Sequence, residues 1–120
     1  MIGTEMECIG QGELAVGAAR VNFSSDASPV VDWNSDEIKR RPVAGVWFGA
    51  PTGDHSVGDL NTGRILIGIA ADDTGNTKGS IPLEVTDYVG VFIPINDITK
   101  LWLTGLNAGD VVEWSIWYKK

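Results

Sequence analysis

The sequence has 120 residues, of which 43% are hydrophobic and 21% charged, a balance typical of one globular domain and not of a disordered chain. Its formal net charge of -7 disfavours nucleic acid as a partner, because phosphate binding requires clustered Lys and Arg. The sequence begins with no recognisable signal peptide, and no window approaches the roughly 20 apolar residues of a membrane span. We therefore expect a protein made in the cytoplasm, with neither export nor membrane insertion.

The N-terminal part of the sequence begins without a sustained period. Residues 1–12 mix glycines with polar and apolar side chains, which predicts an arm or a short edge segment, followed by a single domain over residues 13–120. Strands are expected at 14–16 and 19–23, the second because apolar and polar residues alternate there. The lone cysteine, Cys8, excludes an intrachain disulfide, and we interpret it as a small apolar side chain of the arm.

Residues 36–41 are the only segment in which the sequence favours a turn of helix, which Pro42 would end. The same segment holds the one basic cluster, Lys39-Arg40-Arg41. We interpret this cluster as a solvated turn or an edge held by ion pairs, in preference to a nucleic-acid site.

From residue 43 onward, strand signals dominate the sequence. Both faces of 43–48 are apolar, which predicts a strand buried on both sides or lying at a subunit contact. Further strands are expected at 64–70, 81–85, 88–95, 101–103 and 111–118, and Pro82 places the second of these at a sheet edge. Seven or eight short strands separated by turns predict an antiparallel two-sheet sandwich of jelly-roll or immunoglobulin-like topology, with a small barrel as the alternative.

No residue pattern predicts catalysis. His55 is the only histidine, and its neighbours Asp54 and Ser56 do not form a catalytic triad with it, because successive residues of an extended loop point apart. We interpret His55 as a solvated loop residue and expect neither an enzyme nor a cofactor.

A metal site is considered at one turn only. Asp72, Asp73 and Asn76 carry oxygen ligands of the kind that Ca²⁺ takes. The turn lacks the spacing and the terminal glutamate of the twelve-residue calcium loop, and its residue types also suit a tight turn. We therefore favour a turn over a metal site.

Tryptophan is the most informative excess, with five in the chain. Most are expected in the core, because so large a side chain is costly to leave in water. Trp102 lies between two leucines, and Trp117 lies on the strand face opposite Trp114, so both are predicted to point away from that core, unless the sheet is covered on both faces. The full set of interface candidates is Cys8, Ile9, Trp33, Trp47, Phe48, Trp102 and Trp117.

Several short motifs follow one another in the C-terminal part of the chain. They are Gly63-Arg64-Ile65-Leu66-Ile67-Gly68, Pro82-Leu83-Glu84, Ile93-Pro94-Ile95-Asn96-Asp97, Leu101-Trp102-Leu103 and Gly109-Asp110-Val111-Val112-Glu113-Trp114. This order resembles small β-sandwich structural proteins of tailed-bacteriophage virions, in which N-x-G … I-x-I-G precedes P-L, I-P-I-x-D and L-x-L … G … G-D-x-V-x-W. The similarity covers residues 43–117.

The resemblance implies a virion component, such as a capsid decoration (cement) protein or a head- or tail-associated protein, and it supplies no catalytic residue. We therefore expect the major capsid protein or other virion proteins as partners, and a homo-oligomer with the trimer favoured. The alternative is a carbohydrate-binding or host-adhesion module of the virion, with Trp102 or Trp117 stacking on sugar rings.

Overall fold

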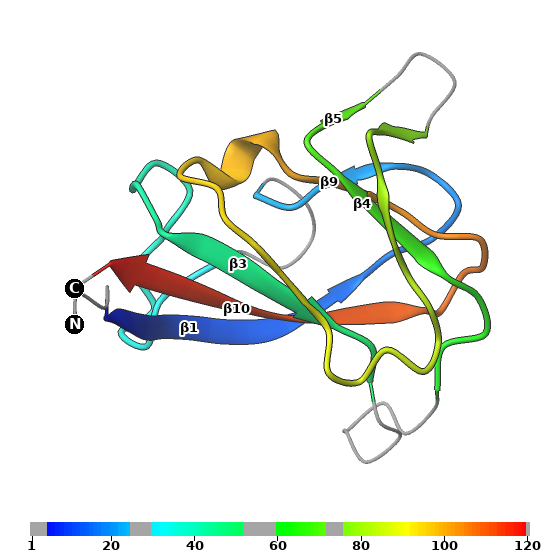
Figure 1. The fold of residues 1–120 in the computed structure, drawn as a ribbon, viewed down its shortest axis with the longest axis horizontal. Coiled ribbons are helices and arrows are strands. Elements are labelled where there is room, and N and C mark those ends of the chain that lie inside the picture. Colours follow the sequence, from blue (N-terminus) through cyan, green and yellow to red (C-terminus); the bar gives the residue numbers. More distant parts are fainter. Residues whose placement is uncertain (1–4, 25–29, 52–59, 72–75, 120) are drawn as a thin grey trace.

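The computed structural model describes residues 5–24, 30–51, 60–71 and 76–119, whose strands form two four-stranded antiparallel sheets packed together (Figure 1). Sheet A has the order β1 (Met6–Ala15), β10 (Val111–Lys119), β3 (Gly45–Gly49) and β8 (Val91–Ile93). Sheet B has the order β2 (Val21–Asn22), β9 (Trp102–Thr104), β4 (Ile65–Gly68) and β7 (Ile81–Leu83). A small hairpin pairs β5 (Ala70–Ala71) with β6 (Thr77–Lys78). The predicted sandwich is confirmed, and the closed barrel is wrong.

The strand order is that of a jelly roll. The chain changes sheet at every step from β1 to β4 and again at every step from β7 to β10, and each sheet alternates early and late strands. The strand that contains Pro82 lies at an edge of sheet B, as predicted. β1 and β10 run side by side along the lower part of sheet A in the view of Figure 1.

The core lies between the two sheets and follows from the alternation of side chains along the strands. In β3, Val46 and Phe48 point inward, and the inward side chains of β10 include Trp114. Phe23, which follows β2, meets Phe48 and Trp114 edge to face, with ring centroids 5.2 and 5.5 Å apart. Truncating a buried ring of this kind to alanine costs about 3–5 kcal/mol.

Residues 6–12, predicted as an arm or edge segment, form the first part of strand β1. This strand pairs with β10 from Met6 opposite Lys119 to Ala15 opposite Val111, with a register shift between Cys8 and Gly10. The boundary predicted at residue 12 therefore falls inside an edge strand that belongs to the domain.

The turn of helix predicted over residues 36–41 is wrong. These residues form turns and a single bridge between Val31 and Glu37, because the Asp32 side chain accepts the backbone N–H groups of Asn34 and Asp36. Among the described residues, the one helical turn is a 3₁₀ segment, Ile98–Lys100, capped by Asp97. No helix in the described part of the chain has the length and apolar character needed to cross a membrane.

Candidate functional site

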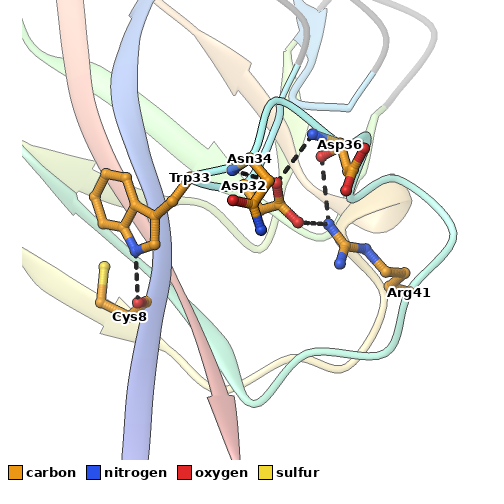
Figure 2. A network of polar contacts seen from close by, with 6 residues as sticks. All are labelled: Cys8, Asp32, Trp33, Asn34, Asp36 and Arg41. Carbon is orange, nitrogen blue, oxygen red and sulfur yellow. Dashed lines mark hydrogen bonds and ion pairs between the residues drawn. The ribbon is translucent and has the colours of Figure 1, made fainter.

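Trp33 lies at the outer edge of β1, where it is exposed and held in a fixed position (Figure 2). Its backbone N–H donates to Ile9 O at 2.9 Å, and its indole Nε1–H donates to Cys8 O at 3.0 Å. The ring nevertheless keeps 60% of its surface exposed. The side chain is thus bonded at its polar atom while its apolar surface faces water.

The position of Trp33 is set by a polar network around Asp32 (Figure 2). Asp32 Oδ1 accepts the backbone N–H groups of Asn34 and Asp36, at 2.8 and 2.9 Å. Asp32 Oδ2 forms an ion pair with Arg41 Nη2 at 2.9 Å, and the same nitrogen donates to Asp36 O. The backbone hydrogen bond from Asp36, followed by the bond from Arg41, lowers the pKa of Asp32 below its ordinary value. We call Asp32, Trp33, Asn34, Asp36 and Arg41 the Trp33 clamp.

The clamp fits against an irregular part of β1. The register shift between Cys8 and Gly10 is a β-bulge or a similar irregularity. A Cβ atom at Gly10 would lie 2.5 Å from Val31 O, so only glycine allows this close approach. The clamp covers the unpaired edge of β1 at Cys8 and Ile9, which in an open edge strand would be available for pairing with another chain.

The outer face of sheet A carries a second set of aromatic side chains. Trp47 of β3 and Trp117 of β10 are half-buried there, and Phe92 of β8 lies beside Trp47 in register. The indole Nε1–H of Trp47 donates to Val89 O at 2.8 Å, and that of Trp117 donates to Ser115 Oγ at 2.9 Å. Neither indole N–H therefore lacks an acceptor.

A groove of about 450 Å³ runs across this face. Glu13 and Glu113 lie directly opposite each other on β1 and β10. Two residues along the same strands, on the same face, Gln11 lies opposite Ser115. Residues lining the groove, which we call the sheet A groove, are Gln11, Gly12, Glu13, Trp47, Glu113, Trp114 and Ser115.

The basic cluster lies at a different place. Lys39, Arg40 and Arg41 line a pocket of about 490 Å³ together with Lys100, which the fold brings there from a distant part of the sequence. Arg41 is ion-paired with Asp32, in agreement with the expectation of an edge held by ion pairs.

One interface candidate is not a surface residue. Phe48 is completely buried, because it alternates with Trp47 and its side chain points into the core, so its assignment as an interface candidate is wrong. Ile9 is half-buried and packs against the core, while Cys8 is a half-buried free cysteine whose thiol donates to Gly10 O.

Trp102 faces away from the core as predicted, but the guanidinium of Arg20 lies 5.7 Å from its ring centroid.

The weak metal candidates were Asp72, Asp73 and Asn76, and the one histidine of the sequence is His55. Asp72, Asp73 and His55 lie outside the described residues, and Asn76 is exposed. Within the ranges that the structure describes, no three or more His, Cys, Asp and Glu side chains gather as metal ligands would.

The sequence did not indicate that the polar residues of the groove belong to one site. Gln11, Gly12 and Glu13 form a polar–small–polar alternation, which is a strand signal, but glycines before and within it obscure the pattern. The opposition of Glu13 and Glu113 depends on pairing between distant parts of the chain, and no local signal reveals it.

The chain was also compared with known proteins. No family model matches it, and neither a curated protein nor a solved structure gives a significant match.

Proposed function

We propose that this chain is a structural protein of a tailed-bacteriophage virion, which binds the major capsid protein or a neighbouring virion protein as a decoration protein does. The motifs of residues 43–117 support the virion assignment by resemblance. The jelly-roll strand order is compatible with it, since capsid domains use this architecture, although the fold also serves other functions.

The observation that carries the proposal is the Trp33 clamp. Tryptophan is enriched among the residues that dominate protein–protein binding energy, and an anchor that is already fixed loses little conformational entropy on binding. Trp33 has 60% of its surface exposed and is held by two hydrogen bonds to β1, supported by the Asp32–Arg41 ion pair. Trp33 is therefore assigned as the anchor of the docking surface.

The test is binding of the purified protein to heads assembled from the major capsid protein of the same virus. The Trp33→Ala variant is expected to bind about tenfold or more weakly, as the loss of an anchor residue predicts. The matched control is Leu106→Ala, because Leu106 is 61% exposed and lies in the turn before β10, at the end of that strand opposite the clamp.

Circular dichroism and the unfolding midpoint establish that both variants keep the fold. No affinity of the wild-type protein for heads or other virion proteins would contradict the virion role. Binding that is lost in Leu106→Ala but kept in Trp33→Ala would reject the clamp as the anchor while leaving the role in place.

A further inference from the structure

The sheet A groove has the arrangement of a small binding site. Successive rows of outward side chains, Gln11 with Ser115 and Glu13 with Glu113, border it on β1 and β10, and Trp47 borders it on β3. The residues between these rows, Gly12 and Trp114, are paired with each other, and the Trp114 side chain is buried in the core. The volume of about 450 Å³ lies within the roughly 300–1,000 Å³ of small-molecule sites.

The indole of Trp47 is seated in a defined orientation at this groove. A Cβ atom at Gly49 would lie 2.4 Å from the far edge of the ring, so the ring lies over Gly49, which is the residue opposite Glu113. The ring also passes close to Gly90, and its Nε1–H donates to Val89 O. The indole of Trp47 therefore lies over the residue that pairs with Glu113, and both Trp47 and Glu113 line the groove.

We propose that the sheet A groove binds a neutral oligosaccharide. A sugar ring presents a face of C–H groups, which stacks on an aromatic surface, and a rim of hydroxyl groups, which donate hydrogen bonds to carboxylate and amide oxygens. In the groove Trp47 supplies the first kind of contact, and Glu13, Glu113 and Gln11 supply the second. This inference does not depend on the proposed virion role.

Other classes of ligand fit the groove less well. The two glutamates and the net charge of -7 oppose nucleic acid and sulfated or uronic sugars. The Trp114 side chain is buried in the core, and the other side chains that line the groove, apart from Trp47, are polar. An aliphatic peptide would therefore find one apolar contact there, with Trp47. A cationic side chain of another protein would pair with the two glutamates. The experiment must therefore distinguish a cationic peptide, the competitor, from a neutral glycan as the ligand.

The site also differs from the sugar-stacking residues expected from the sequence. The guanidinium of Arg20 lies over the ring of Trp102, on the outer side of sheet B. Trp117 lies on sheet A, but it is not among the residues that line the groove. Of these three tryptophans, Trp47 is the one that lines the groove together with carboxylate and amide side chains.

The experiment is a glycan array that carries neutral oligosaccharides of glucose, galactose, mannose and N-acetylglucosamine, with sialylated and sulfated glycans as separate groups. Neutral glycans that bind are then titrated calorimetrically against the wild type and the variants. Trp47→Ala is expected to weaken binding about tenfold. Gly49→Ala keeps the indole but moves it from its seat, so it is expected to weaken binding as well.

Two control variants complete the design. Gly17→Ala adds the same methyl group where no atom lies within 4 Å, and Trp33→Ala removes a tryptophan outside the groove. Both are expected to bind the glycan as the wild type does. Loss of head binding without loss of glycan binding in Trp33→Ala would separate this site from the clamp.

Several results would overturn the proposal. They are an array without neutral glycan signals, binding confined to anionic glycans, and binding that survives in Trp47→Ala and Gly49→Ala but is lost in Trp117→Ala or Trp102→Ala. Titration with an arginine- and lysine-containing peptide tests the competitor. Binding of that peptide in a Trp47-dependent manner, with no glycan bound, would assign the groove to a cationic partner instead.

Discussion

A single carboxylate, that of Asp110, joins the two sheets at one end of the sandwich. Asp110 Oδ1 accepts the backbone N–H and the hydroxyl of Thr62, at 2.9 and 3.1 Å, and Oδ2 accepts the N–H of Gly63 at 3.0 Å. Beside it, Asn61 and Val111 exchange two hydrogen bonds through the Asn61 side chain. The segment before β4 of sheet B is thus tied to the start of β10 of sheet A.

Replacing Asp110 with alanine is expected to lower the free energy of unfolding by about 2–3 kcal/mol, because bonds to a charged acceptor are lost while their donors stay in place. Urea denaturation followed by tryptophan fluorescence measures the change.

The control is Asp87→Ala, which removes a single bond from the backbone N–H of Glu84 in an exposed turn and should cost less. An Asp110→Ala variant no less stable than Asp87→Ala would contradict the assigned role.

The motifs that contain these residues were visible in the sequence, but their contact was not. Asn61, Thr62 and Gly63 end a polar stretch of the sequence, and Gly109 and Asp110 precede the strand predicted from Val111; these residue types suit turns. Their hydrogen bonds span 47 to 50 residues of sequence. A pattern within a short window carries no information about such a partner.

At the scale of elements, edge strand β1 and the segment that covers it form one unit. The bulge at Cys8 and Gly10, the close approach of Val31 O to Gly10, and the two bonds from Trp33 place residues 31–33 along the strand. A long exposed edge promotes association with other strands. The clamp therefore protects the part of β1 that it covers and presents Trp33 on the surface at the same time.

Gly10→Ala is expected to push the clamp away from β1, because the added methyl group would meet backbone that cannot rotate aside. The expected cost is about 1–3 kcal/mol of unfolding free energy, the range for inserting a methyl group where there is no room. In proton NMR, the Trp33 indole N–H should exchange with solvent faster than in the wild type.

Gly17→Ala is the reference, with an expected change of less than about 1 kcal/mol, since no atom lies within 4 Å of the new methyl group. Equal stability of the two variants, together with slow exchange of the Trp33 indole in Gly10→Ala, would show that the clamp does not depend on this contact.

The elements show where sequence patterns work and where they fail. The apolar run in residues 43–48 and the alternation in residues 111–118 correctly predicted strands, and the inward position of Trp114 follows from that alternation. β1 was missed as a full strand because its glycines break the apolar period. Residues 36–41 precede Pro42 and were predicted to form a turn of helix. The side chain of Asp32 accepts the backbone N–H of Asp36 instead, and this hydrogen bond favours a turn.

For the whole molecule, strand content was predictable and strand order was not. Short alternating strands with turns restrict the fold to sandwiches and barrels. The choice of a jelly roll follows from pairings such as Leu14 with Val112, which lie almost the full length of the chain apart. The residues of a strand determine which of its faces is buried, but they do not determine which strands lie beside it. The pairing depends on how all the strands pack together in the core.

The surface of the described residues carries exposed apolar side chains. Exposed apolar side chains occur at several places outside the clamp and the groove, with Val89 exposed to 90% and Ile69 to 63%. A contiguous apolar patch marks an interaction site, whereas single exposed side chains are common on any surface, so each of these positions has to be tested by substitution.

From the resemblance to virion decoration proteins, we expect the purified protein to form a homo-oligomer, with the trimer favoured, in sedimentation velocity experiments at micromolar concentration. Replacement of Val89 by Asp is the variant that tests one candidate contact. A monomer at all accessible concentrations would contradict the expected oligomer, and a trimer unaffected by Val89→Asp would place its interface elsewhere.

The pairing of β1 with β10 also has a consequence for biosynthesis. β10 is the one strand that pairs with β1 in sheet A, so β1 has no partner until the ribosome has added residues 111–119, whereas β3 can pair with β8 earlier. Domains that complete their pairing early can fold as they emerge, whereas this one must hold its first strand unpaired until β10 has been made. Translation speed and the chaperones near the ribosome are therefore expected to affect its yield more than they affect proteins built from neighbouring hairpins.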